Sequence, residues 1–272
     1  MDGDGMSDGL RIVVCVKQVP DTTDVRVDPK TGTLVREGMP AVLNPFDHFA
    51  VEEAVRVRDE VGGEVTVLSM GPPQARSAVM RCLALGADRG VLLCDRALAG
   101  SDTLATSYAL WRAIETLGGA DLMVCGMQAV DGDTAQVGPG LAARLGVPQI
   151  AYAERISVSD PDGTVRARRT FDDVTEEVEA PLPALVTMTT PSNFRPTNPP
   201  FSRIRAAARK PYVEWTARDI DADPGHIGLE GSPTWVVRVY APERKGDAER
   251  IEGPPDDVVE RLVGVMRREG FL

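Results

Sequence analysis

The residues best suited to chemistry in this chain run from Cys125 to Gly140 and read CGMQAVDGDTAQVGPG. They follow an apolar, strand-like run (Asp121 to Val124) and precede a helix-like one (Leu141 to Leu145). A strand that breaks into glycines before a helix leaves backbone N–H groups unpaired, and these groups with the helix dipole suit a phosphate. The stretch therefore predicts a nucleotide site. Its glycines and polar residues are Gly126, Gly132, Gly138, Asp131, Asp133, Thr134 and Gln136.

Two helix starts carry side chains that either cap the helix or meet a ligand. Asp133 or Thr134 is expected to cap a helix from Ala135 to Leu145, and the Thr134 hydroxyl also suits a phosphate oxygen. Asp102, Thr103 and Thr106 lie at the head of another helix, where a cap and a functional contact are both open interpretations, and Asp102 and Thr106 are the candidate cofactor contacts. Their place after a predicted strand favours the cofactor contact slightly.

Several other kinds of site are excluded by spacing. The chain has no G-x-G-x-x-G fingerprint and no P-loop motif. A calcium loop starting at Asp131 fails, because Gln136 stands where glycine is needed and Ala142 where glutamate is needed. The four cysteines show no C-x-x-C spacing, and the two histidines have no motif around them. We therefore expect a nucleotide holder with no catalytic residues and no metal of its own.

Composition narrows the class of protein further. The net charge is −11 and the pI is near 4.8, so a nucleic-acid-binding surface is not expected. Neither a secretory signal nor an apolar stretch of membrane-spanning length is seen, and we expect a cytoplasmic protein that does not insert into membranes. A length of 272 residues fits one large domain with appendages.

Strand-like and helix-like segments alternate over the first 150 residues. The predicted strands are Leu10 to Val19, Glu64 to Met70, Gly90 to Cys94 and Asp121 to Cys125; the predicted helices start at Asn44, Pro73, Thr103 and Ala135. Such alternation predicts an α/β fold with a mainly parallel sheet and helices on both faces. Ligands of these sheets bind at the carboxyl ends of the strands, beside the switch in strand order. A hairpin is expected around Asp28 to Gly32.

The pattern changes after Pro148. Four segments read as antiparallel strands that extend the sheet: Gln149 to Val158, Thr164 to Phe171, Glu176 to Ala180 and Ala184 to Thr189. The chain is thus divided into a disordered extension (residues 1–9), a nucleotide-binding domain (10–190), an irregular loop and arm (191–253) and a C-terminal helix (254–272). The arm carries Trp215 and Trp235 and is interpreted as a partner-binding segment, with an arm that wraps its own domain as the alternative.

Six motifs in order across Leu10 to Pro148 resemble the β subunits of electron transfer flavoproteins, including their nitrogen-fixation-associated branch. They are VCVKQVPDT, NPFDxxAVEEA, VTVLSMGPPQA, CLALGADRG, GSDTLATSYAL and GMQAVDGDTAQVGP, and the likeness continues through the tail. The resemblance implies an adenine-nucleotide-hydrolase-like fold and an α-subunit partner that carries the redox FAD. In this family the β subunit holds AMP or, in electron-bifurcating members, the ADP part of a second FAD that accepts hydride from NADH.

The family's nucleotide pocket carries over onto matching positions of this chain. These positions are Cys15, Asn44, Pro45, Phe46, Asp47, Met70, Ala129, Val130, Asp131, Gly132, Asp133, Thr134, Ala135, Gln136, Val137 and Gly138. The resemblance makes Asn44 and Asp47 polar contacts for the adenosine and places the phosphates on the backbone from Asp131 to Gly138. The sequence DGDTAQVGP is closer to that of the bifurcating members, which favours a second FAD rather than AMP in this pocket. A bifurcating member would also use ferredoxin as one of its electron acceptors.

Partners and alternatives follow from the same likeness. The PPFSRI stretch corresponds to the loop that docks acyl-CoA dehydrogenases by an aliphatic anchor, but Phe201 stands at that place here. The partner is therefore left open as an acyl-CoA or other dehydrogenase or a quinone reductase. A universal-stress-type nucleotide sensor is disfavoured because such modules end near Pro148, and an ATP-dependent ligase or pyrophosphatase is disfavoured because no catalytic loop is present.

Overall fold

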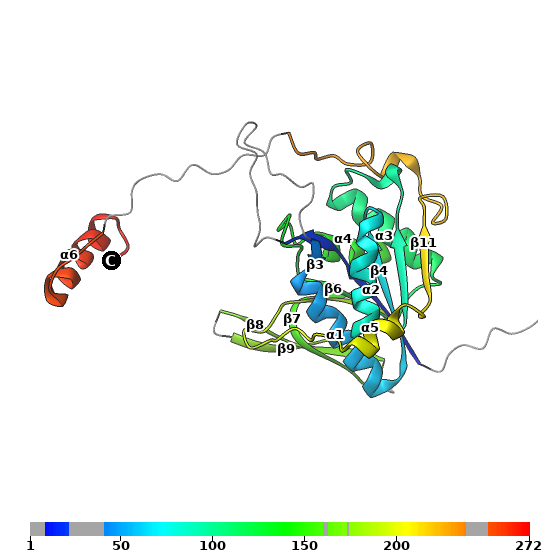
Figure 1. Ribbon diagram of the computed structural model, residues 1–272, viewed down its shortest axis with the longest axis horizontal. Coiled ribbons are helices and arrows are strands. Elements are labelled where there is room, and N and C mark those ends of the chain that lie inside the picture. The colour runs from blue at the N-terminus through cyan, green and yellow to red at the C-terminus, as the bar shows by residue number, and fades with distance from the viewer. Residues whose placement is uncertain (1–8, 22–40, 160–162, 173, 238–249) are drawn as a thin grey trace, which may run out of the picture. The chain divides into compact units, whose positions relative to one another are not determined.

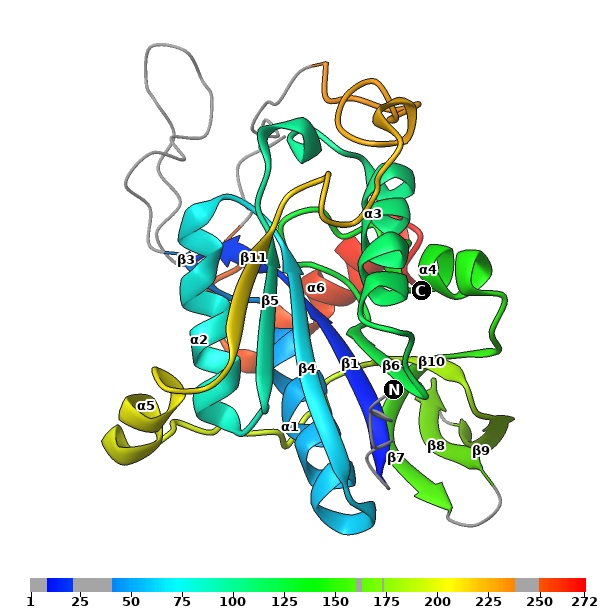
Figure 2. The same ribbon diagram turned by 90° about the vertical axis from the view of Figure 1, so that its right-hand side faces the viewer.

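Continuous apolar runs build the centre of the sheet, since a parallel strand is buried on both faces. The structure, a computed structural model, describes residues 9–21, 41–159, 163–172, 174–237 and 250–272. Nine strands form one sheet in the order β11-β5-β4-β1-β6-β10-β7-β8-β9 (Figures 1 and 2). In that order they are Tyr212–Trp215, Arg89–Leu93, Gly63–Met70, Leu10–Val16, Leu122–Gly126, Ala184–Met188, Gln149–Ser159, Thr164–Phe171 and Val174–Pro181. The predicted α/β class with a mainly parallel sheet is confirmed.

Helices cover both faces of this sheet (Figure 2). Helices α1 (Pro45–Val61), α2 (Arg76–Leu85) and α5 (Phe201–Ala207) contribute to one apolar core, and α3 (Thr103–Thr116) and α4 (Val137–Leu145) to the other. Short 3-10 turns span Pro73–Ala75, Arg96–Leu98 and Pro224–His226, and β2 (Gln18–Pro20) pairs with β3 (Ala41–Leu43) in a separate antiparallel ribbon. Among the described helices, none has the length and hydropathy to cross a membrane.

The strand order reverses beside β1, and this reversal creates the binding crevice of the fold. From β1 the chain moves to β4 and then β5 on one side, whereas the next strand, β6, returns to the other side of β1. Both neighbours run parallel to β1, with Cys15 level with Leu68 of β4 and with Cys125 of β6. The connections that follow β1 and β6 therefore diverge at the carboxyl edge, the place where ligands of open α/β sheets bind; we call this region the crevice.

Strand β10 differs from the prediction. It was expected to be antiparallel, but it lies between β6 and β7 and is parallel to both; only the β7–β8 and β8–β9 pairs are antiparallel. All five of its residues are buried, which is the pattern of a central strand rather than of an edge. The second half of β7 and the strands β8 and β9 form the expected antiparallel extension.

The segment after residue 190 is less irregular than predicted. Strand β11 joins the edge of the sheet parallel to β5, and Ala217, Ile220 and Ile227 are buried in the core beneath α3. Up to residue 237 this segment is therefore an arm that wraps its own domain. Residues 250–272 belong to a second unit with helix α6 (Pro255–Arg268), which confirms the C-terminal helix. The predicted hairpin and residues 1–8 of the N-terminal extension lie outside the described residues.

Candidate functional site

The candidate site is the connection between β6 and α4, residues 127–136, at the carboxyl edge of the sheet. Helix α4 begins at Val137 with Gln136 as its N-cap residue, and no side chain caps it. The predicted helix start at Ala135 and the predicted caps Asp133 and Thr134 are therefore wrong. The reason is conformational, since Asp133 and Ala135 have φ of 49° and 53°, in the left-handed region that a helix cannot include.

This strained backbone turns amide groups away from the chain's own acceptors. Within the described part of the chain, the N–H groups of Thr134, Ala135 and Gln136 donate to no acceptor. The loop residues around them are mostly exposed, so these donors face solvent. Left-handed alanine is uncommon and costs on the order of 1–3 kcal/mol, a cost that concentrates at functional sites. Three successive free donors ahead of a helix suit an anion.

The first half of the loop is held rigidly from below by Asn44. This side chain has no solvent exposure; its Nδ2 donates to the Gln128 carbonyl at 2.9 Å and its Oδ1 accepts from the Val130 N–H at 3.2 Å. The N–H groups of Gly132 and Asp133 then donate to the Ala129 carbonyl. Asn44 precedes α1 as expected, but its side chain makes no helix cap and holds the loop in place.

Asp47 is the second support beneath the loop. Its Oδ2 accepts from the Lys17 N–H at 2.7 Å, and its Oδ1 packs closely against Gly126, so it ties the ends of β1 and β6 to the first turn of α1. The side chain is only 5% exposed, and burial raises the pKa of Asp47 to about 7. Asn44 and Asp47, the predicted adenosine contacts, lie beneath the loop, and their side chains bond to backbone groups of the protein.

The charged side chains at the loop are those of Lys17, Asp131 and Asp133. The Lys17 Nζ lies 2.7 and 2.8 Å from the two carboxylate oxygens of Asp131, linking the end of β1 to the loop. The Gln128 Nε2 donates to Asp133 Oδ1 at 2.8 Å, and the Thr103 hydroxyl donates to Gln136 Oε1 at 2.7 Å. The crevice thus brings one ammonium group, two carboxylates and free amides together.

The three glycines of the loop region differ in what they allow. A Cβ at Gly126 would lie 2.2 Å from Asp47 Oδ1, and one at Gly138 would lie 2.6 Å from the Thr187 methyl group. A Cβ at Gly132 would meet no atom within 4 Å. Gly126 and Gly138 are therefore required by close packing, whereas the space above Gly132 is open.

Asp102 acts as a helix cap and as an anchor for the arm. Its Oδ1 accepts from the N–H groups of Leu104 and Ala105, and its Oδ2 accepts from the N–H and hydroxyl of Thr234. Desolvation opposes ionisation, but these hydrogen bonds outweigh it and lower the pKa of Asp102. Thr106 is half-buried one turn later in α3. The cap interpretation of Asp102 is thus confirmed, and it is Thr103 that contacts the loop.

The remaining predicted pocket residues surround the same crevice. Cys15 is buried at the end of β1 beside Cys125, and the hydrogen bond between the two thiols together with burial raises the pKa of Cys125 well above its ordinary value. Met70 is half-buried at the end of β4. Pro45 is exposed and Phe46 half-buried at the start of α1, next to the end of β6. The structure therefore gathers the ends of β1, β4 and β6, the first turn of α1 and the loop.

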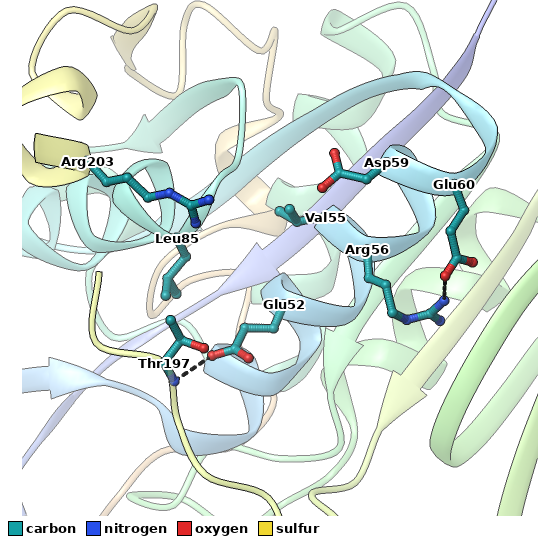
Figure 3. Close-up of a pocket in the computed structure, with 8 residues that line it drawn as sticks. All are labelled: Glu52, Val55, Arg56, Asp59, Glu60, Leu85, Thr197 and Arg203. Carbon is teal, nitrogen blue, oxygen red and sulfur yellow. Dashed lines mark hydrogen bonds and ion pairs between the residues drawn. The ribbon is translucent and has the colours of Figure 1, made fainter. Parts of the chain in front are cut away.

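The predicted docking residues lie elsewhere and differ in exposure. Phe201 opens α5 and is 79% exposed, and Trp235 is 70% exposed. Trp215 is half-buried in β11 against the core. A pocket of about 300 Å³ lies beside α1, near the chain that leads to α5, and Figure 3 shows the Glu52 carboxylate there, which accepts from the Thr197 N–H. This pocket is lined by α1 together with Leu85 of α2, Arg203 of α5 and Thr197, and none of its lining residues belongs to the loop after β6.

Sequence reasoning missed Lys17 and Gln128 as residues of the site. Lys17 had a detectable signal, because it is a charged residue near the carboxyl end of a predicted buried strand at the switch in strand order. Gln128 acts through its contact with Asp133, which no motif predicts. Together, the fold and the loop define an α/β protein of the open parallel-sheet class, with an anion-suited crevice at its topological switch point.

Comparison with known proteins then identifies the family. A family model described as "Electron transfer flavoprotein domain" matches residues 31–220. The "Electron transfer flavoprotein subunit beta" of Clostridium acetobutylicum is 46% identical over 263 residues, covering 97% of this chain and 100% of that protein. "Protein FixA" of Azorhizobium caulinodans is 46% identical over 244 residues, covering 88% and 86%. The "Caffeyl-CoA reductase-Etf complex subunit CarD" of Acetobacterium woodii is 44% identical over 265 residues, covering 97% and 100%.

The chain belongs to the electron transfer flavoprotein family, as one of its β subunits. It is an electron-transfer protein of a flavoprotein family, which confirms the resemblance drawn from the six motifs. The nucleotide-sensing module and the ATP-dependent ligase or pyrophosphatase are set aside by these matches over nearly the whole chain.

Proposed function

We propose that this β subunit pairs with an α subunit and holds an adenine nucleotide in the crevice between β1 and β6. In this role the chain takes part in electron transfer between a dehydrogenase or NADH and downstream acceptors. The observation that supports the proposal is the row of N–H groups from Thr134 to Gln136, which donate to no acceptor among the described residues, in a loop that the buried Asn44 holds at residues 128 and 130 and that Lys17 contacts at Asp131. Free donors held in one geometry favour a phosphate without a further ordering cost.

The residues of the crevice fit the phosphate end of a nucleotide. The Thr134 hydroxyl is exposed beside the free amides, and the open space above Gly132 allows a ligand to approach the backbone closely. Asn44 and Asp47 would act by holding the loop rather than by bonding the adenosine. Phe46 and Met70, both half-buried at the rim, would supply apolar contacts to the adenine ring.

The nucleotide would be either AMP or the ADP part of a second FAD, and the loop wording DGDTAQVGP favours FAD. FAD supplies the exchange of electron pairs for single electrons when it is bound. The chain's own residues would bind and orient the phosphate end. A relative named for the caffeyl-CoA reductase-Etf complex fits a β subunit that works inside a larger assembly. Electron bifurcation towards an acceptor such as ferredoxin would then be the specific activity.

Helix α5 would present the docking surface for the dehydrogenase or quinone reductase. Phe201 and Ile204 are exposed there, and a hollow of about 550 Å³ lies along the same helix between Phe201, Arg205 and Arg209. An exposed aromatic side chain with neighbouring arginines is the composition of an interface hot spot. Trp235, exposed with Val236 and Val237 beside it, would contact the α subunit.

The test is the nucleotide content of the purified heterodimer. FAD and AMP released by denaturation are quantified, and the intact complex is titrated with NADH. Two FAD per heterodimer with reduction by NADH support the bifurcating form, and one FAD with one AMP and no reduction supports the ordinary shuttle. A complex that holds one FAD and no other adenine nucleotide would contradict nucleotide binding by this chain.

A further inference from the structure

We propose that Lys17 binds the phosphate of the nucleotide directly, and that Asp131 is the competing counter-ion that holds the Lys17 ammonium beside the crevice. The Lys17–Asp131 ion pair would then set the affinity of the site for phosphorylated ligands. This inference rests on the proposed nucleotide-binding function and adds to it a charged residue to which the sequence analysis gives no role in the site.

The charge balance of the crevice requires a cation. Asp131 and Asp133 stand on the loop, whereas Lys17 is the one cationic side chain that bonds to this loop among the described residues. The partner of Asp133 is the neutral amide of Gln128. A phosphate brought to the amides of Thr134 to Gln136 would meet net repulsion from these carboxylates unless an ammonium group faced it.

The position of Lys17 allows that contact. The Lys17 side chain is 47% exposed, and the Lys17 N–H is bonded to Asp47. The backbone of Lys17 is therefore held in place, while its side chain has room to move. An ammonium group has three donors, and the two oxygens of Asp131 lie 2.7 and 2.8 Å from it. Asp131 is three residues ahead of Thr134 in the same loop, so the Lys17 ammonium is paired with the loop that carries the free amides of the described chain.

A purely structural role for the pair makes the opposite prediction. If Lys17 served only to hold the loop closed through Asp131, removal of either charge would loosen the loop and weaken nucleotide binding. If Lys17 is a phosphate ligand, removal of the Asp131 charge frees it and strengthens binding. The sign of the Asp131→Asn effect therefore separates the two roles.

The experiment titrates AMP and adenosine into the full-length chain, purified with its α subunit and freed of bound AMP, by calorimetry. Lys17→Met is expected to weaken AMP binding by about tenfold or more, the usual effect of losing a charge-assisted hydrogen bond. Asp131→Asn is expected to strengthen AMP binding about threefold or more, because the competing charge is gone. Neither change should alter adenosine binding more than about twofold, because adenosine lacks the phosphate.

Arg11→Met is the matched control. Arg11 pairs with Asp121 at the opposite end of the same two strands, with comparable exposure, so it removes a β1–β6 ion pair far from the crevice. It should leave AMP affinity unchanged. Weaker AMP binding by both Lys17→Met and Asp131→Asn overturns the proposal, as does an equal loss of adenosine binding in Lys17→Met. If the wild-type complex binds no AMP, the proposed nucleotide-binding function itself is wrong, and this result does not depend on the variants.

Discussion

The packing of Gly126 against α1 gives a prediction about both the fold and the site. Gly126 ends β6, and its backbone touches the first turn of α1 where Asp47 is anchored. A Cβ added here would lie 2.2 Å from Asp47 Oδ1, 2.8 Å from Phe46 Cβ and 2.9 Å from the Asp47 nitrogen. Asp47 cannot rotate away without leaving the Lys17 N–H unpaired, so α1 and β6 must separate.

The magnitude follows from the tightness of the contact. Overpacking a filled site costs roughly 1–3 kcal/mol, and the upper end applies because two of the three neighbours are backbone or the first side-chain carbon. Replacing glycine by alanine also lowers the entropy of the unfolded chain, which returns less than about 1 kcal/mol. Gly126→Ala should therefore lower the free energy of unfolding by about 2 kcal/mol.

The assay is urea unfolding followed by tryptophan fluorescence, compared at constant m-value. Gly132→Ala is the matched control, because its Cβ meets nothing within 4 Å; it should be neutral or stabilising by up to about 1 kcal/mol. Gly126→Ala should also lose nucleotide, since the Gly126–Asp47 contact positions the loop. Equal unfolding free energies for the two variants would refute the argument that α1 fixes the end of β6.

Three further predictions concern buried groups and exposed aromatic residues. Burial raises the pKa of Asp47 from 3.8 to about 7, so the folded chain keeps a proton that the unfolded chain loses. The stabilisation that comes from this bound proton is complete below about pH 4 and is lost as the pH rises through about 7. The free energy of unfolding should therefore fall over this range by up to about 1.4 kcal/mol per pH unit, and Asp47→Asn should remove that fall when it is measured by urea unfolding. Glu53 is buried in α1 and pairs with Arg56 of the same helix and with Arg155 of β7. Glu53→Ala should lower the free energy of unfolding by about 3 kcal/mol in the same assay. Trp235→Ala should leave stability unchanged and weaken surface-plasmon-resonance binding to the α subunit, whereas Trp215→Ala should destabilise the chain by about 2 kcal/mol.

The main elements of the fold follow from local pattern, because a strand buried on both faces needs a continuous apolar run. This holds for β1, β4, β5 and β6 and for the helices between them. Strand β10 shows what the local hydrophobic pattern does not predict. Its buried run is visible in the sequence, but its direction depends on insertion between β6 and β7, which no local signal encodes. The same is true of β11, a four-residue strand within a tail rich in proline and glycine.

The place of the site was predictable and its internal contacts were not. The break between β6 and α4 is visible as a run of glycine and polar residues. The bonds from Asn44 to residues 128 and 130 and from Lys17 to Asp131 join positions more than eighty residues apart. The sequence likewise predicts a helix start at Ala135, but the left-handed backbone at that residue moves the start to Val137. Sequence reasoning therefore indicated the loop that we propose to hold the phosphate, but not the side chains that contact and charge it.

Amide hydrogen exchange at Thr134, Ala135 and Gln136 tests the central claim most directly. These N–H groups donate to no acceptor in the described chain, so without nucleotide they should exchange as fast as exposed amides. Added AMP or retained FAD should slow them strongly, while the Val130 N–H, bonded to Asn44 throughout, should change little. Bound nucleotide with unprotected amides at these three residues would contradict the account.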